Sequence, residues 1–212
     1  MTIAVITENY TEQQLTTFFP GEGIEWRLSG KVNEVPGAEV YIDLDFVNEP
    51  GRCGALSRLL PALIIVNAVT PTLREIGHPF VRINGWPGFL ERDIHELVVP
   101  GDQTIAQRMA ILYQRLGREY RILRDEPGMI SPRVLSTLIN EAFFTWEAQV
   151  STKEEIDTAM RLGTNYPMGP FEWSERIGLG HIAGLLGSLS RTDSSYIPCQ
   201  ALLKAAGKLK YD

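Results

Sequence analysis

Short apolar runs alternate with helical patterns as far as Leu123, and this alternation limits the fold more than any other feature of the chain. Arg52–Leu60 has helical spacing, and Asp102 and Gly117 are the cap and stop of another predicted helix. The predicted strands are Ile3–Ile6, Ile24–Leu28, Val40–Phe46, Leu63–Val66, Phe80–Ile83, Ile94–Val99 and Tyr120–Leu123. Strands that alternate with helices predict a mainly parallel sheet covered by helices.

The pattern changes after Pro127-Gly128, where apolar residues recur only at helical spacing. A helix is predicted over residues 133–148, with Ser131 and Pro132 at its start. We therefore expect two domains, α/β over residues 1–126 and all-α over residues 127–212.

Cap and stop signals predict three further helices in the second domain. The first begins with a capping box, either Ser151 with Glu154 or Thr152 with Glu155, and ends at Gly163. The other two are a helix that begins at Pro170 and a helix over Ile197–Ala206.

Composition excludes several kinds of partner and compartment. The net charge of −6 disfavours nucleic acid and anionic membranes. Cys53 and Cys199 have neither the number nor the spacing of a disulfide framework or a metal site, so we expect free thiols and no metal. The first residues are acidic where a signal peptide is basic, and no apolar run reaches the ~18 residues of a membrane span. We expect a cytoplasmic protein without membrane contact.

Residues 154–173 read EEIDTAMRLGTNYPMGPFEW and carry the most specific pattern in the chain. This segment resembles a hallmark of the helical C-terminal domain of the 3-hydroxyacyl-CoA dehydrogenase family, (E)DID-AM-LG-GYPMGPFEL-D-IGLD. The matching residues are Ile156, Asp157, Ala159, Met160, Leu162, Gly163, Tyr166, Pro167, Met168, Gly169, Pro170, Phe171, Glu172 and Ile177 to Leu179. The resemblance is strong over residues 125–205, moderate over 95–125 and weak over 1–94.

The resemblance implies a layout and a metabolic role. It implies a Rossmann-like domain followed by a helical domain of the 6-phosphogluconate dehydrogenase C-terminal type, a homodimer formed through the helical domain, and a place in fatty-acid and acyl-CoA metabolism. An acyl-CoA-like molecule is accordingly the expected ligand.

The features that would bind NAD are missing. A Rossmann turn needs glycines that let the backbone approach the pyrophosphate, but the chain has no glycine before Gly21, and Glu8 and Glu12 stand in the first turn. These acids can instead cap a short helix over Tyr10–Phe19 and favour its dipole. The predicted second strand ends in Ser29-Gly30, where an acid would hold the ribose. We expect no cofactor here, although active relatives use NAD.

A deletion adds to this difference from the family. Relatives have a helical excursion after the second strand that helps to hold CoA, whereas residues 30–37 here have only the length of a turn. The resemblance therefore implies that the usual CoA platform is shortened.

The family's catalytic pair is a histidine base oriented by a glutamate, and the glutamate corresponds to Glu96. The histidine position falls on Asn84, or on Ile83 if the chain is aligned on Trp86-Pro87. His95 cannot replace the base, because neighbouring strand residues point to opposite faces. Glu96 is then either a relic or a structural acid, with Arg82 or Arg133 as a partner.

The two residues that position substrate in the family are an asparagine and a serine. The asparagine position is Pro132, whose side chain has no donor or acceptor. The serine position is Val69, with Asn67 retained nearby, and Thr70 could serve only after a shift of one residue.

Three functions remain open from the sequence. The first is a non-catalytic relative that keeps the scaffold for binding or assembly. The second is an active acyl-CoA oxidoreductase with a rearranged site around Glu96, Asn84 and Asn67. The third is a subunit that pairs with an active dehydrogenase through the helical domain.

Overall fold

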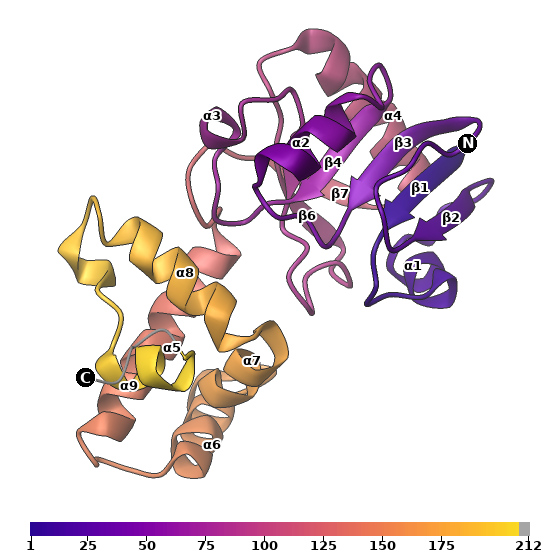
Figure 1. The fold of residues 1–212 in the computed structure, drawn as a ribbon. Coiled ribbons are helices and arrows are strands. Elements are labelled where there is room, and N and C mark those ends of the chain that lie inside the picture. Colours follow the sequence, from indigo (N-terminus) through magenta and orange to yellow (C-terminus); the bar gives the residue numbers. More distant parts are fainter. Residues whose placement is uncertain (208–212) are drawn as a thin grey trace. The chain divides into compact units, whose positions relative to one another are not determined.

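The structure is a computed structural model that describes residues 1–207. The chain forms two compact units, Met1–Met129 and Ile130–Asp212, which we describe separately (Figure 1). The first is an α/β unit and the second is a helical unit.

A seven-stranded sheet forms the centre of the α/β unit, in the order β2-β1-β3-β4-β5-β6-β7. All neighbouring strands are parallel except β5 and β6, which confirms the predicted, mainly parallel sheet. The strands are β1 (Thr2–Ile6), β2 (Glu25–Ser29), β3 (Ala38–Asp43), β4 (Leu63–Asn67), β5 (Val81–Ile83), β6 (Ile94–Val98) and β7 (Glu119–Ile122).

Alternate residues of the central strands face two separate cores, because side chains alternate across a strand. Helices α1 (Glu12–Phe18) and α4 (Gln103–Leu116) pack on one core together with residues such as Ile3 and Ile65. Helices α2 (Pro50–Ser57) and α3 (Leu73–Ile76) contribute to the other core, with residues such as Ile64 and Val66. The four-residue α3 was not predicted.

Local signals set the ends of α4 as the sequence predicts. The Asp102 carboxylate accepts hydrogen bonds from the backbone N–H groups of Thr104 and Ile105. Gly117 adopts a left-handed conformation with φ of 66°, a backbone conformation that glycine reaches without strain.

The short connection between β2 and β3 replaces the missing excursion with local packing. Val32 and Val35 pack against the core on the α2 side. The Val35 N–H donates to the Tyr41 hydroxyl at 2.9 Å, which fastens the connection to β3. The residues Glu25 and Arg27 of the edge strand β2 form an exposed ion pair.

In the helical unit, α5 packs against α7, α8 and α9. The helices are α5 (Ser131–Glu147), α6 (Lys153–Thr164), α7 (Pro170–Ile177), α8 (Leu179–Leu189) and α9 (Gln200–Ala205), with a short 3-10 turn at Ser194–Tyr196.

Three expectations about these helices need correction. Helix α6 does not end at Gly163, because it continues to Thr164 and Asn165 takes the left-handed cap with φ of 56°. Helix α8 was not predicted, and the last helix begins at Gln200 rather than Ile197. The capping box of α6 uses Thr152 and Glu155, the second of the two alternatives.

The motif at residues 154–173 forms the corner between α6 and α7. The buried Asp157 carboxylate accepts the backbone N–H groups of Phe171 and Glu172 at 2.8 and 3.1 Å, which caps α7. Gly169 lies so close to Asp157 that a Cβ atom would come within 2.3 Å of it. Glu172 in turn accepts the Gly169 N–H and pairs with Arg161. The motif is thus explained by helix capping and close packing.

Candidate functional site

The crevice at the carboxyl ends of β1 and β3 is where a sheet of this topology usually binds ligands. The chain leaves β1 for β2 on one side and returns to β3 on the other, which makes this the switch point of the sheet. Parallel pairing places Ile6 next to Asp43, so the loops that follow these two residues meet there.

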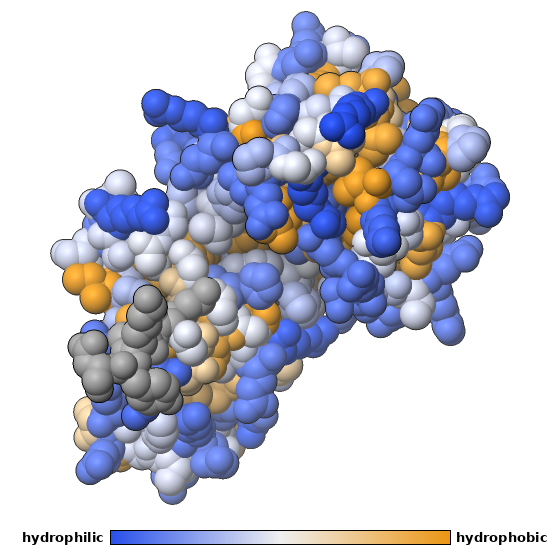
Figure 2. Space-filling model, in the orientation of Figure 1, coloured by the Kyte–Doolittle hydropathy of each residue, from blue (hydrophilic) through white to orange (hydrophobic). Residues whose placement is uncertain are grey.

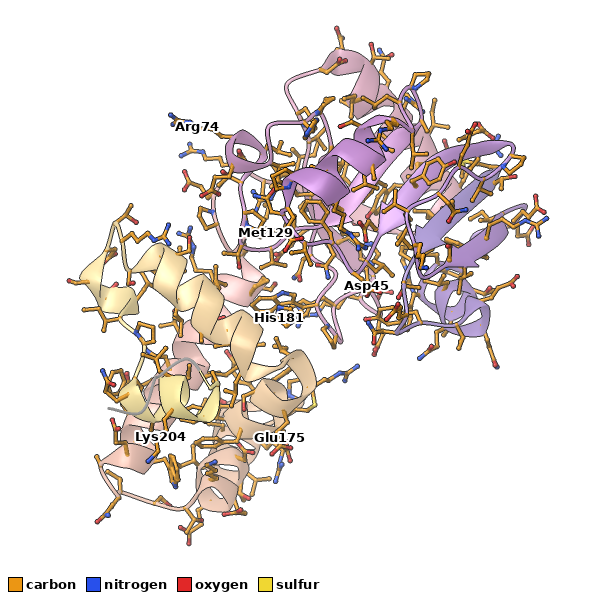
Figure 3. The ribbon with its side chains drawn as sticks, viewed as in Figure 1. Asp45, Arg74, Met129, Glu175, His181 and Lys204 are labelled. Atoms are coloured by element: carbon orange, nitrogen blue, oxygen red, sulfur yellow. The ribbon has the colours of Figure 1, made fainter. Side chains whose placement is uncertain are left out.

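Asp45 joins these two loops. Its carboxylate accepts the Glu8 backbone N–H at 2.6 Å and the Asn9 side-chain amide at 2.9 Å. Figure 3 labels Asp45 on the α/β unit. A backbone N–H of this first turn, the type of donor that holds phosphate in a Rossmann site, is therefore bonded to a carboxylate of the same chain.

A buried ion pair supports the Asp45 loop. The fully buried side chain of Asp43 accepts two hydrogen bonds from Arg52, at 2.6 and 2.7 Å, and also accepts the Asp45 N–H. Burial raises the pKa of the Asp43 carboxyl, although the Arg52 guanidinium opposes this effect. The hydrogen bond with Asp43 raises the pKa of Arg52.

The start of α1 is closed by its own side chains. Thr11 accepts the Gln14 backbone N–H, and the Gln14 side chain accepts the Thr11 N–H, which completes a capping box. Glu12 lies in the first turn, where its charge favours the helix dipole. Thr11, not an acid, is thus the N-cap of this helix.

Asn67 and Val69 follow β4, but the Asn67 side chain already has partners. Its amide donates to the Leu44 carbonyl at 3.0 Å and its oxygen accepts the Gly85 N–H at 3.0 Å. A Cβ atom on Gly85 would come within 2.8 Å of Asn67, so this close approach requires glycine. Val69 is buried, and its carbonyl accepts hydrogen bonds from Arg82 and Gly128.

Asn84 and Glu96 are neighbours across the antiparallel pair of β5 and β6. The Asn84 N–H donates to the Glu96 carbonyl at 3.2 Å, and opposite residues of such a pair project to the same face. Asn84 is buried and Glu96 is half-buried. Arg121 is the register partner of Glu96 on β7.

Arg82 and Arg133 were the candidate partners of Glu96 for the case in which it belongs to a buried charged network. The buried guanidinium of Arg82 donates to the Asp125 carboxylate at 2.6 Å and to the carbonyls of Ala68 and Val69. Burial lowers the pKa of Arg82 while Asp125 raises it. The sequence analysis missed Asp125 as the partner of Arg82.

Pro132 and Arg133 belong to the helical unit, whereas Glu96, Asn84, Asn67 and Val69 belong to the α/β unit. Pro132 is buried in the first turn of α5, where the missing N–H costs nothing.

The histidines of the α/β unit have structural partners. His95 is buried on the face of β6 opposite Glu96, with its ring 5.4 Å from the Phe19 ring. His78 Nδ1 lies 2.8 Å from the Ser57 hydroxyl, which itself donates to the Cys53 carbonyl. Because the single hydroxyl proton of Ser57 is used in this way, His78 must be the donor and does not activate Ser57 as a nucleophile.

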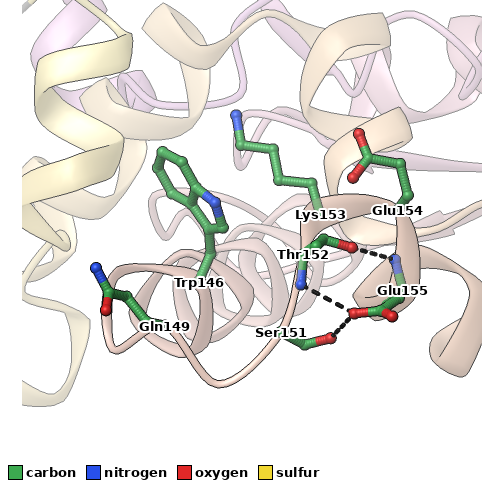
Figure 4. A pocket seen from close by; sticks show the side chains of 7 residues that line it. All are labelled: Trp146, Gln149, Ser151, Thr152, Lys153, Glu154 and Glu155. Atoms are coloured by element: carbon green, nitrogen blue, oxygen red, sulfur yellow. Dashed lines mark hydrogen bonds between the residues drawn. The ribbon is translucent and has the colours of Figure 1, made fainter.

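A shallow pocket of about 550 Å³ lies in the helical unit between the end of α5 and the start of α6 (Figure 4). The Lys153 ammonium lies 4.3 Å from the centre of the Trp146 ring and also near Phe143 and Phe171, within cation–π range. The Ser151 hydroxyl, together with Thr152, lowers the pKa of Glu155. Three of the polar residues that line the pocket, Ser151, Thr152 and Glu155, therefore bind one another.

Within residues 1–207, no cluster of three or more His, Cys, Asp or Glu side chains could hold a metal ion. None of the helices there is long and apolar enough to cross a membrane.

Comparisons with known proteins agree with this architecture. Residues 128–210 match the family model of the 3-hydroxyacyl-CoA dehydrogenase C-terminal domain. The chain is 33% identical over 175 residues to a probable 3-hydroxybutyryl-CoA dehydrogenase of Bacillus subtilis, which covers 81% of this chain and 60% of the relative. It is 39% identical over 104 residues to the 3-hydroxyadipyl-CoA dehydrogenase of Escherichia coli, covering 48% of this chain and 22% of that protein.

The fold is similar along nearly the whole chain to a solved relative. The (S)-3-hydroxybutyryl-CoA dehydrogenase of Ralstonia eutropha superposes with a TM-score of 0.76 at 17% identity, over 97% of this chain and 94% of that one. The aligned segments nevertheless span less than two thirds of the two curated relatives. Residues 128–210 thus match the C-terminal domain of the 3-hydroxyacyl-CoA dehydrogenase family, and the chain as a whole is similar to dehydrogenases of that family.

Proposed function

We propose that this chain is a 3-hydroxyacyl-CoA dehydrogenase-like protein that has lost NAD binding and hydride transfer and that keeps the family scaffold for binding or assembly. The observation that carries the proposal is the hydrogen bond that the Asp45 carboxylate accepts from the Glu8 backbone N–H. A dinucleotide phosphate would have to displace this carboxylate and approach Glu8 and Glu12, and like charges repel.

The residue types at the family's catalytic positions support the same proposal. General-base catalysis needs a group that can take the hydroxyl proton, and neither Asn84 nor Ile83 can do so. Pro132 and Val69 likewise offer no side-chain hydrogen bond to a substrate. An acyl-CoA-like molecule is the ligand that the similarity to this family favours. The proposed compartment is the cytoplasm, whose reducing conditions are compatible with free thiols at Cys53 and Cys199.

The test is a binding titration with NADH and, separately, with acetoacetyl-CoA. We expect no saturable enhancement of NADH fluorescence at micromolar protein, and no turnover of the two ligands together. Saturable binding of NADH in this range would contradict the proposal. A thermal shift with acetoacetyl-CoA alone would identify a binding protein, and no shift with either ligand would favour an assembly role.

A second candidate is an active oxidoreductase with a rearranged site, favoured by the position of Asn84 beside Glu96 on one face of the sheet. It predicts turnover of acetoacetyl-CoA that Glu96→Gln abolishes. Glu119→Gln is the matched control, since this acid lies on the neighbouring strand with its side chain 69% exposed. Turnover that survives both substitutions would exclude a role for Glu96.

We also propose a homodimer formed through the helical unit, supported by exposed apolar residues on α5. The third alternative, a subunit of an active dehydrogenase, predicts instead that the purified chain is monomeric and forms a complex with such an enzyme.

A further inference from the structure

His95 connects three segments of the α/β unit. Its Nε2 lies 3.1 Å from the Leu90 carbonyl, and its Nδ1 lies 3.1 Å from the Tyr113 hydroxyl of α4. A carbonyl can only accept, so Nε2 carries the proton and Nδ1 accepts the Tyr113 O–H. The neutral ring thus has both nitrogens satisfied while it is only 2% exposed.

The segment that His95 holds is the loop at residues 84–93, between β5 and β6. Turn hydrogen bonds from Phe89 to Trp86 and from Arg92 to Phe89 shape this loop. The Leu90 carbonyl bonds this loop to the His95 side chain of β6, and the Leu90 side chain is buried in the core. The strand itself is held separately, by pairing with β5 and β7.

A second proton on His95, at Nδ1, would displace the Tyr113 O–H from its acceptor. It would point at the Tyr113 oxygen, and the displaced Tyr113 O–H would face the apolar core. The ring of Phe19, directly after α1, contacts His95, and Tyr120 is the register partner of His95 on β7; neither side chain carries a charge that could stabilise an imidazolium.

The charged groups around His95 also disfavour its protonation. The positive Arg118 acts on it from the end of α4, and the Asp93 carboxylate is already paired with Arg118 at 2.7 Å. Desolvation, the largest effect, lowers the pKa of His95 to about 4, and hydrogen bonds to the backbone of Leu90 and of Arg92 oppose this shift.

We propose that His95 acts as an acid-sensitive latch. While its ring is neutral, His95 holds the loop at residues 84–93 against the sheet. When the ring takes up a proton, the loop is released while β6 and α4 stay in place. In the open loop the ring would have the ordinary pKa of about 6.5. Because the pKa is depressed in the closed state, the closed loop is fully favoured above pH 6.5. The ratio of closed to open loop then falls about tenfold per pH unit as the pH is lowered towards 4.

Amide hydrogen exchange tests the latch if rates are corrected for their intrinsic pH dependence. In the native chain, we expect protection of residues 84–93 to fall about tenfold per unit between pH 6.5 and 4.5, while protection of β4 is retained. A pH-independent loop, or loop and β4 protection that fall together, would overturn the proposal.

Two substitutions separate the latch from a general effect of acid. His95→Gln keeps one N–H donor and one oxygen acceptor but does not titrate, so its loop protection should be independent of pH. His78→Gln is the matched control and should behave like the native chain. If His95→Gln does not fold, an NMR titration of the His95 ring in the native chain tests the latch. The ring and the loop amides must then titrate with the same pH midpoint, and different midpoints would refute the latch.

Discussion

Single residues of the 154–173 motif act through packing, and Gly169 is the sharpest case. Gly169→Ala would place a methyl group within 2.3 Å of Asp157 and disturb the cap of α7. We expect it to lower the free energy of unfolding by about 1–3 kcal/mol, measured by urea denaturation. Gly163→Ala is the control, since nothing lies within 4 Å of its Cβ position inside α6, and it should stabilise by roughly 0.5–1 kcal/mol. Equal effects would show that Asp157 does not restrict residue 169.

At Glu96, we expect a small effect of substitution, because the position of the histidine that it would orient holds Asn84. The register partner of Glu96, Arg121, has a side chain that is 63% exposed, so water screens the charge of this neighbour. Arg82, a partner expected from sequence, donates to Asp125 instead. We expect Glu96→Gln to change the free energy of unfolding by about 1 kcal/mol or less, seen as a small shift in melting temperature. A loss of about 3 kcal/mol or more would assign Glu96 to a buried charged network.

Between elements, the pair of Arg82 and Asp125 fastens the segment after β7 to β5 and α3. Asp125 accepts hydrogen bonds from the Arg82 guanidinium and from the backbone N–H groups of Leu73 and Arg74. Asp125→Asn would leave the buried guanidinium without its counter-charge, and we expect a loss of about 3 kcal/mol in denaturant unfolding. Asp93→Asn removes the acid of a similar pair with Arg118, but the Asp93 side chain is 93% exposed, so it should cost roughly 0–1 kcal/mol. Similar losses in both variants would mean that burial does not set the strength of these pairs.

The elements that the sequence predicted were those with strong local signals. Helix α4 has both an N-cap and a glycine stop, and the strands of the sheet have compact apolar runs. Helix α8 was missed because Gly180, Gly184 and Gly187 interrupt its pattern, although Ile182, Leu185, Leu186 and Leu189 recur at helical spacing and are buried. The roles of Asp45 and Asp125 could not be predicted, because each depends on contacts between segments far apart in the sequence. The residue types at the family's catalytic positions could be identified from the sequence, but the residues that contact them in the fold could not.

For the whole molecule, the question is what covers the outer side of α5. Val134 and Phe144 are 58% and 42% exposed, on the side of the helix away from its buried residues. Figure 2 shows hydrophobic patches among hydrophilic residues on both units, so exposure alone does not identify an interface. Among these patches we choose the α5 surface, because it belongs to the helical domain. We propose that two copies of the chain pair through this domain.

Light scattering tests this pairing directly. We expect a mass about twice the 23.7 kDa of one chain at micromolar concentration. Val134→Glu should shift the mass towards one chain, because a carboxylate buried in an apolar interface without a partner is costly. Ile111→Glu makes the same kind of change at an equally exposed residue, 58%, on α4 of the α/β unit, and it should leave the dimer intact. A monomeric native chain would refute the dimer, and dissociation by Ile111→Glu with retention in Val134→Glu would move the interface to the α/β unit.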